Sequence, residues 1–440
     1  MDKKIKSKFF NINKSLLELK NRIFFLCFMI FIFRVGSFIP VPGINITILT
    51  DFLQYQNSTI IDMINVFSGG SLGRASIFSL GIMPYISSSI IIQLLTLFSS
   101  RLSSIQKEGD FGKKIIDKYT RYLTLFISVL QAIGISTTLP NIPLIPDLVP
   151  HPGFSFYVIS VISLCTGTVF LMWLAELITD YGIGNGISII IFIGIISSLP
   201  SSIIQIIKQV SESNLSFFML FCIFVFIISV IFLVVFVERS YRKITLNYPK
   251  QNRNYNTYVS QSTHLPLKIN ISGVMPAIFS SSIIIFPVTL LSWFGILNKY
   301  DWLFKFSIYL QPGHLLYIII YSVLIVFFCF FYSNLTFNPR ETAENLKRSG
   351  AFIPGIRPGE QTSKYISKIM YKITFIGSLY MMFICLVPDF MRVFMKVPFH
   401  FGGTSLLIVV VVIIDVVAQV QTLFISSQYS SILKKSNFNF

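Results

Sequence analysis

The sequence predicts an all-α polytopic membrane protein with ten transmembrane helices and cytoplasmic termini. The chain of 440 residues is 53% hydrophobic and only 12% charged, which is unlike an ordinary soluble domain. Ten apolar stretches approach the length of about 20 residues that a helix needs to cross a bilayer. The loops between them alternate in charge, and 28 of the 35 lysines and arginines fall on one side. The positive-inside rule assigns that side to the cytoplasm.

The first five stretches form the amino-terminal half of the predicted fold, residues 22–204. A basic cytoplasmic segment, residues 1–21, precedes the first stretch. That stretch is too long for the core of a secretory signal, and no cleavage site of small residues follows it, so we expect a retained helix. The five stretches lie at 22–41, 76–98, 122–139, 154–175 and 183–204.

One external loop is much longer than the others. It covers residues 42–75 and ends in a glycine-rich run from Phe67 to Arg74. Glycines permit tight, irregular backbone. Composition alone is compatible with a surface loop and equally with a segment that folds back into the membrane, which requires surrounding protein or a cavity.

The last five stretches form the second half, residues 216–424, and a cytoplasmic tail, 425–440, follows them. Since each half holds an odd number of helices, a repeated fold would have to be inverted in the membrane, although no residue-level repeat is visible. Two cytoplasmic loops, 238–271 and 334–368, are long, basic and rich in turn residues. They are either solvated loops that set topology or a docking surface for an acidic partner, ribosomal RNA or lipid head groups. The five stretches lie at 216–237, 272–293, 312–333, 369–388 and 399–424.

The sequence lacks the usual signatures of catalysis. It has no phosphate-binding glycine loop, no histidine or cysteine spacing typical of a metal site and no nucleophile arrangement. We therefore expect no cofactor, no metal and no enzymatic activity. All five cysteines fall within apolar stretches, where buried thiols are the expectation. Among charged residues inside the stretches, Arg34 lies near the middle of the first and Asp415 in the last. For Asp415 we expect polar packing beside Gln419 and Gln421 rather than a role in coupled transport.

Six longer sequence segments, which we call strings, carry information that composition does not, and they occur in a fixed order along the ten stretches. Together they resemble the SecY family, the channel subunits of the bacterial Sec protein translocase. The similarity runs from about residue 20 to 435. The strings are Gly69–Tyr85, Gly182–Ser188, Gln261–Lys268, Asn338–Asn345, Arg357–Thr362 and Gly402–Ile408.

The resemblance implies two pseudo-symmetric, inverted halves around an hourglass pore. A ring of apolar side chains closes the waist of such a pore, and a short plug, at about residues 60–75 here, fills its outer funnel. The implied plug residues are Asn65, Phe67, Gly69, Gly70 and Gly73. The implied ring consists of Ile82, Ile86, Ile187, Ile191, Ile278 and Ile408. Two pairs in the ring are four residues apart, which places each pair on one helix face.

The resemblance also implies a lateral gate and a docking surface. The gate lies between the second and third helices on one half and the seventh and eighth on the other. Its implied residues are Ser87, Ser88, Gln93, Ile278 and Ser281. The implied docking residues for the SecA ATPase or the ribosome are Arg357, Pro358, Gly359, Glu360, Arg340, Arg239, Arg242, Lys250 and Arg253.

The implied function is that of the central pore subunit of the Sec translocon in the bacterial inner membrane. Such a subunit conducts unfolded secretory polypeptides and releases signal sequences and transmembrane segments sideways into lipid. The implied partners are SecE and SecG in a heterotrimer, SecA, the translating ribosome, signal sequences and nascent chains, YidC, the SecD/SecF complex and membrane lipid.

Two other classes of function are compatible with ten spans. A secondary transporter of a small solute would need polar or charged residues clustered at mid-membrane, which Arg34 and Asp415 barely provide. A membrane scaffold or receptor without a pore would leave the glycine-rich segment before the second helix without a purpose. The six strings favour the channel over both.

Overall fold

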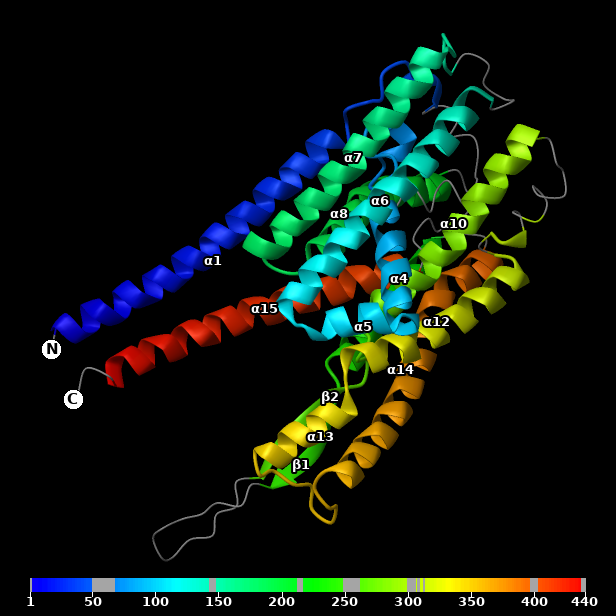
Figure 1. Cartoon of the computed structure of the whole chain (residues 1–440). Helices are drawn as coiled ribbons and strands as arrows, with labels where there is room; N and C mark the ends of the chain where they lie inside the picture. The colour runs from blue at the N-terminus through cyan, green and yellow to red at the C-terminus, as the bar shows by residue number, and fades with distance from the viewer. Residues whose placement is uncertain are drawn as a thin grey trace, which may run out of the picture.

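The computed structural model describes residues 2–49, 68–141, 148–211, 217–247, 262–298, 306, 309–311, 313–395 and 403–436. This part of the chain is mainly helical, with one two-stranded hairpin (Figure 1).

Each of the ten predicted stretches overlaps one long helix, so the fold class is confirmed. The first half holds α1 (Asp2–Gly36), α4 (Met83–Phe98), α6 (Asp110–Thr138), α7 (Phe154–Tyr181) and α8 (Gly186–Ser211). The second half holds α9 (Phe217–Glu238), α10 (Met275–Asn298), α12 (Leu315–Thr336), α14 (Glu360–Met395) and α15 (Gly403–Ser436). Shorter elements are η1 (Leu72–Arg74), α5 (Ser100–Lys107), η2 (Leu139–Asn141) and α13 (Pro339–Arg348).

Several helices are apolar and long enough to cross a bilayer by themselves. Within the described residues these are α7, α9, α12, α14 and α15, and α4 joined to α5 is a sixth candidate with a bend of 107° at the junction. The apolar segments of α8 and α10, residues 186–200 and 275–289, are shorter. Prolines lie inside α8 and α10 at Pro200 and Pro287, which membrane helices tolerate because neighbouring groups satisfy the freed backbone atoms.

The second predicted stretch begins as irregular backbone rather than as a helix. We expected a helix from residue 76, but α4 begins at Met83, and residues 77–82 form turns. Gly81 has a φ of 58°, which side-chain-bearing residues rarely adopt. Pro84 follows in the first turn of α4, a position where its missing N–H costs nothing.

Backbone pairing explains why this irregular segment is stable. The N–H of Val41 donates to the carbonyl of Ala75 at 2.8 Å, and the N–H of Ile77 donates to the carbonyl of Ile39 at 3.0 Å. The same pairing explains the end of the first helix. We expected that helix to reach residue 41, but α1 ends at Gly36 because the chain beyond it is extended against residues 75–77.

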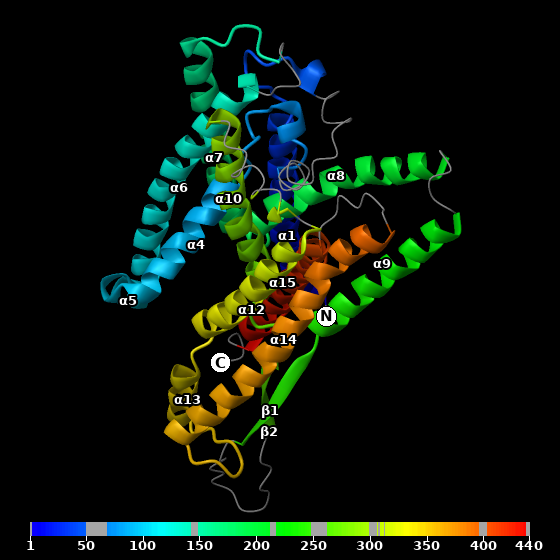
Figure 2. The same cartoon turned by 90° about the vertical axis from the view of Figure 1, so that its right-hand side faces the viewer.

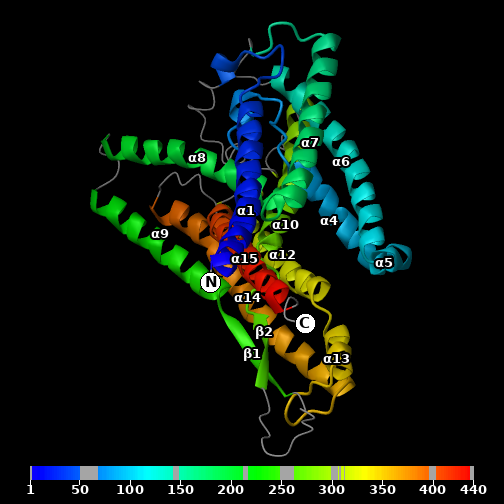
Figure 3. The ribbon, with the colours of Figure 1, turned by 90° about the vertical axis from the view of Figure 1, so that its left-hand side faces the viewer.

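The first and last helices lie beside each other. α1 packs against α15 and α7, and α1 and α15 run toward the same end of the molecule (Figures 1 and 3). The predicted amino-terminal segment, residues 1–21, is helical from Asp2 and continuous with α1.

The short link between α7 and α8 contacts both α1 and α15. The N–H of Gly184 donates to Oε1 of Gln419 on α15 at 2.6 Å, and Arg22 Nη1 on α1 lies 3.5 Å from the carbonyl of Gly182. A Cβ on Gly186 would lie 1.8 Å from the carbonyl oxygen of Ala175, so only glycine fits there. The backbone of the link is therefore approached closely by the side chains of Gln419 and Arg22 and by the carbonyl of Ala175.

The hairpin projects away from the helices with α13 and the first turns of α14 (Figure 2). It consists of β1 (Tyr241–Asn247) and β2 (Ser262–Lys268), paired antiparallel with Tyr241 opposite Lys268. Ile244 and Leu246 are buried, whereas the residues before and between them are exposed. This alternation is typical of a strand that covers a core with one face.

Candidate functional site

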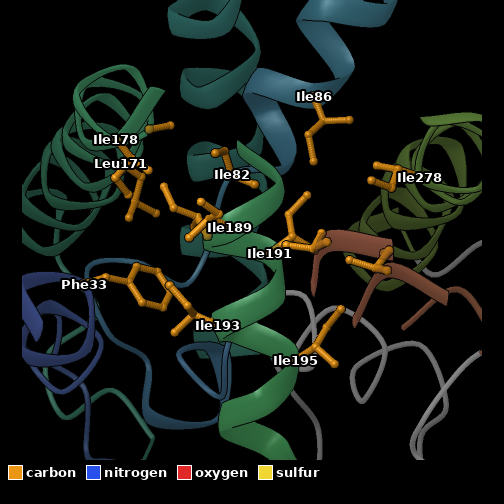
Figure 4. Packing of buried hydrophobic residues seen from close by; sticks show 14 of the residues in the cluster. Phe33, Ile82, Ile86, Leu171, Ile178, Ile189, Ile191, Ile193, Ile195 and Ile278 are labelled. Carbon is orange, nitrogen blue, oxygen red and sulfur yellow. The ribbon is translucent and has the colours of Figure 1, made fainter. Parts of the chain in front are cut away.

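Four helices from the two halves meet at one apolar core. α4 packs against α10 and α8 packs against α15. The isoleucines that these helices contribute are almost fully buried, with exposed fractions of 4% for Ile86, 1% for Ile191, 3% for Ile278 and 0% for Ile408. Figure 4 shows Ile86, Ile191 and Ile278 pointing toward a common space. Side chains from distant parts of the sequence thus gather at the contact between the halves.

The two remaining predicted ring residues join the same cluster. Ile82 is 4% exposed and is the N-cap of α4, and the N–H of Ile86 donates to its carbonyl at 3.1 Å. Ile187 is partly buried and packs against the cluster. All six side chains are aliphatic. Such a cluster excludes water and offers no group for acid–base chemistry.

The described part of the predicted plug is held against α1 and α8. The carbonyl of Gly69 accepts from Ser197 Oγ at 3.1 Å and from Arg34 Nη1 at 3.4 Å. Gly69 has a φ of 72°, and a Cβ there would lie 3.1 Å from Cα of Gly194. Gly70 follows with a φ of 81°, and Gly73 lies within η1. Asn65 and Phe67 lie outside the described residues.

Two arginines flank one aromatic ring next to this segment. The guanidinium carbon of Arg74 lies 4.0 Å from the centre of the Phe38 ring, and that of Arg34 lies 5.6 Å from it. Cation–π contacts of this kind stabilise a charge near an apolar surface. Sequence reasoning noticed Arg34 only as a charge within an apolar stretch, because nothing in the sequence pairs it with Gly69.

Two of the three predicted gate serines donate to backbone carbonyls of their own helices. Ser88 and Ser281 are buried, and their hydroxyls donate to carbonyls three or four residues earlier, at 2.7 Å and 2.9 Å. Ser87 is partly buried on α4. Among the described residues, Ser88 and Ser281 therefore make no hydrogen bond between α4 and α10.

One contact across the predicted gate involves residues that the sequence did not single out. Ser282 Oγ on α10 lies 3.9 Å from the sulfur of Met83 on α4. Only the packing of α4 on α10 reveals this pair, since serine and methionine are unremarkable in an apolar helix. Gln93, which the sequence did predict for the gate, donates to Ser89 Oγ within α4 at 3.1 Å.

The two long basic loops form one structural unit. The backbone of Asn247 in β1 exchanges two hydrogen bonds with Phe352, at 2.9 Å and 3.1 Å. We call the hairpin, α13, residues 349–359 and residues 360–373 of α14 the loop unit. Its apolar core consists of Ile244, Leu246, Leu267, Ile353, Ile366, Met370 and Ile373.

The turn that carries Arg357 is fixed at both ends. Gly355 and Gly359 have φ values of 82° and 106°, which favour glycine. Thr362 is buried, and its hydroxyl donates to the carbonyl of Arg357 at 2.9 Å. The side chains of Arg357 and Pro358 are exposed. A rigid turn thus presents a cation to solvent.

The surface of the loop unit is basic. Arg239, Arg242 and Arg340 are exposed, and the pair between Arg340 and Glu344, at 3.6 Å, is too exposed to contribute much stability. Lys364 Nζ lies 2.8 Å from Oε1 of Glu360; it lowers the pKa of the Glu360 carboxyl, and Glu360 raises the pKa of Lys364. Lys250 and Arg253 lie outside the described residues.

Comparison with known proteins identifies the family. The SecY family model matches residues 76–417. The protein translocase subunit SecY of Buchnera aphidicola subsp. Schizaphis graminum is 59% identical over 439 residues, which covers 100% of both chains. The chain belongs to the SecY family.

Solved structures share the fold of this SecY-family chain. One, described as a protein-conducting channel, superposes with a TM-score of 0.65 at 16% identity and covers 93% of each chain. Another, Sec61 in the canine ribosome–channel complex from the endoplasmic reticulum, has a TM-score of 0.62 at 15% identity, again over 93% of each chain. The resemblance inferred from the six strings is therefore confirmed, and family membership favours a translocase over a secondary transporter.

The contact between Arg34 and Gly69 leads to a testable prediction. We expect Arg34→Gln to accelerate backbone hydrogen exchange in residues 68–74 by about tenfold, because a hydrogen bond from a charged donor contributes about 1.5–3 kcal/mol. Mass spectrometry of the purified chain would measure the exchange. Arg22→Gln is the matched control, since Arg22 lies on the same helix but contacts Gly182. Equal exchange in wild type and R34Q would show that Arg34 does not hold this segment.

Proposed function

We propose that this chain is the central pore subunit of a Sec translocon in a bacterial inner membrane, with both termini in the cytoplasm. It conducts unfolded secretory polypeptides and releases apolar segments sideways into lipid. The observation that carries this proposal is the gathering of six predicted ring isoleucines where α4 and α8 meet α10 and α15. The positive-inside distribution of lysines and arginines supports the orientation.

The isoleucine cluster has the physical properties of a seal. A narrow apolar constriction excludes water, and hence ions, by dewetting. Isoleucine side chains form no hydrogen bonds or ion pairs, so they bind no passing polypeptide strongly and can close around many sequences. The segment around Gly69, Gly70 and Gly73, with Asn65 and Phe67, fills the outer funnel in this proposal. The hydrogen bonds from Ser197 and Arg34 support its resting position.

Lipid partition explains the sideways release of apolar segments. A central Leu, Ile, Phe or Val favours the membrane by about 0.3–0.6 kcal/mol, whereas a central Lys or Arg costs about 2.5–3.5 kcal/mol. A pore that opens between α4 and α10 lets lipid make this selection. The few polar contacts across that surface, through Ser282 and Met83, support the gate at Ser87, Ser88, Gln93, Ile278 and Ser281.

Energy comes from partners in this proposal, and the chain itself is not an enzyme. The loop unit supplies an exposed basic surface through Arg357, Pro358, Gly359, Glu360, Arg340, Arg239 and Arg242, and the loop 248–261 adds Lys250 and Arg253. SecA and the translating ribosome dock there, and SecE and SecG complete the heterotrimer. The Sec61 structure in a ribosome–channel complex, which shares this fold, supports a ribosomal partner.

Photo-crosslinking would test polypeptide conduction directly. We expect a crosslinker at Ile191, in a channel reconstituted into vesicles, to label the mature part of a secretory protein stalled halfway through. A crosslinker at Ile196 on the same helix, 38% exposed, is the matched control and should label lipid or neighbouring subunits instead. Labelling of the stalled chain from neither position, with partners still labelled from the loop unit, would contradict the proposal.

The seal leads to a conductance prediction. We expect Ile191→Asn to raise the resting ion conductance of a planar bilayer by about tenfold, because a buried amide recruits water into an apolar constriction. Ile196→Asn, which alters an outward-facing residue of α8, should leave the conductance at the wild-type value. Equal conductance of I191N and wild type would remove Ile191 from the seal.

The docking surface leads to a prediction about Arg357. We expect Arg357→Glu to reduce SecA-driven preprotein transport by at least about tenfold, because charge reversal replaces attraction with repulsion at an interface. Insertion of the subunit into the membrane should be unchanged, since Arg357 is exposed. Lys20→Glu, on α1 and outside the loop unit but also exposed, is the control. Full transport by R357E would exclude Arg357 from partner coupling.

A further inference from the structure

A buried polar cluster lies where the hairpin meets α10. Glu238, the last residue of α9, is 7% exposed, and Asn270, between β2 and α10, is 4% exposed. Asn270 Nδ2 donates to Glu238 Oε1 at 2.6 Å. A charged carboxylate buried to this degree is costly unless it is hydrogen-bonded, so this contact determines how α9 and the segment before α10 are held together.

Asn270 uses the rest of its side chain to organise the start of α10. Its Nδ2 also donates to the carbonyl of Gly273 at 3.1 Å and lies 3.6 Å from the sulfur of Met381 on α14. Its Oδ1 accepts from Ser272 Oγ at 3.0 Å. One amide thus connects α9, the first turn before α10, and α14.

Chain geometry places this cluster between the loop unit and the pore. On one side, the N–H of Ile269 donates to the carbonyl of Ser240 at 3.2 Å, which extends the hairpin to the cluster. On the other side, α10 begins at Met275, and the N–H of Ile278 donates to the carbonyl of Val274 at 3.3 Å. Ile278 lies only eight residues beyond Asn270, and Ser281 lies one turn further.

Charges from two further elements act on the cluster. Lys268, at the end of β2, attracts the carboxylates of Glu238 and of Asp415 on α15, and Asp415 repels Glu238. Asp415 lies on the helix that also carries Ile408. The position of the hairpin is therefore linked electrostatically to α9 and to α15, the ring helix that carries Ile408. The packing of Asp415 beside Gln419 and Gln421 stays a prediction.

We propose that Glu238 and Asn270 form a joint that transmits movement of the loop unit to α10. The inference rests on the proposed function, because it takes the loop unit as the docking surface and α10 as a gate helix. When a partner displaces the hairpin, the joint carries the start of α10 with it, since breaking the hydrogen bond between Asn270 and Glu238 would leave buried polar atoms without a partner. Glu238 and Asn270 are positioning residues that touch no substrate.

A disulfide reporter across the gate would test the joint. Met83→Cys and Ser282→Cys replace two residues whose side chains touch between α4 and α10, so the cross-link forms when these helices are close. The probe is purified SecA with ATP, added to the complete translocon in vesicles, and mass spectrometry of the linked peptide gives the rate. In the reporter with an otherwise wild-type chain, we expect SecA to slow cross-linking by about fivefold. SecA would shift the population away from the closed state, in which the two cysteines lie close together.

Variants of the joint separate coupling from stability. We expect Glu238→Ala and Asn270→Ala to reduce the SecA effect to less than about twofold, whereas Glu238→Gln, which keeps an acceptor oxygen for Asn270, retains most of it. SecA affinity should be unchanged in all three, because the loop-unit surface is intact. Thr374→Val is the matched control. It removes a buried hydrogen bond of 2.8 Å to Ser333, between α12 and α14 in the same half, and should keep the full effect.

The outcomes distinguish this inference from the proposed function. A full SecA effect in E238A and N270A would overturn the joint while leaving the channel proposal intact. Loss of the effect in T374V as well would also overturn the joint, since any buried polar contact in this half would then serve equally. No SecA effect in the reporter with an otherwise wild-type chain would instead count against docking and gating as proposed.

Discussion

The structure depends on an apolar contact between two sets of helices. α4 and α8 from the first half meet α10 and α15 from the second, and isoleucines fill the contact. In a membrane, lipid is as apolar as these side chains, so the hydrophobic effect gives little preference for this contact over a contact with lipid. Close packing and the covalent connection of the halves must hold it together. A contact of that kind can separate without exposing polar groups that need new partners, which suits a channel that opens and closes.

Polar interactions gather at the two ends of this apolar contact. At one end, Arg34 and Ser197 hold the carbonyl of Gly69, and the guanidinium groups of Arg34 and Arg74 lie close to the Phe38 ring. At the other, Glu238, Asn270 and Ser272 connect α9, α10 and the hairpin. Buried hydrogen bonds are directional and costly to break. They can therefore define discrete positions of the segment 68–74 and of α10, whereas the isoleucines between them impose no such geometry.

The loop unit combines apolar packing and backbone hydrogen bonds at the surface of the molecule. Its apolar core joins two loops that are about 100 residues apart in the sequence, so the turn at Arg357 and the hairpin belong to one packed unit. The bridge between Asn247 and Phe352 makes that connection through backbone groups. It does not depend on particular side chains, and it joins the basic surface to the segment that leads into α10. A continuous path of packed residues and backbone hydrogen bonds thus leads from the turn at Arg357 to the helix that carries Ile278.

The sequence by itself determined the ten helices, the basic side and the family, because these follow from apolar length, charge asymmetry and six long strings. It also predicted the ring isoleucines, but only through the resemblance, since six isoleucines among many carry no signal of their own. The tertiary structure decided what the sequence could not. The irregular start before Met83 follows from pairing with residues 39–41, the role of Arg34 follows from its contact with Gly69, and Ser282 on α10 contacts Met83 on α4. These outcomes depend on contacts between residues far apart in the chain, whereas hydropathy and local propensity describe only neighbours along it.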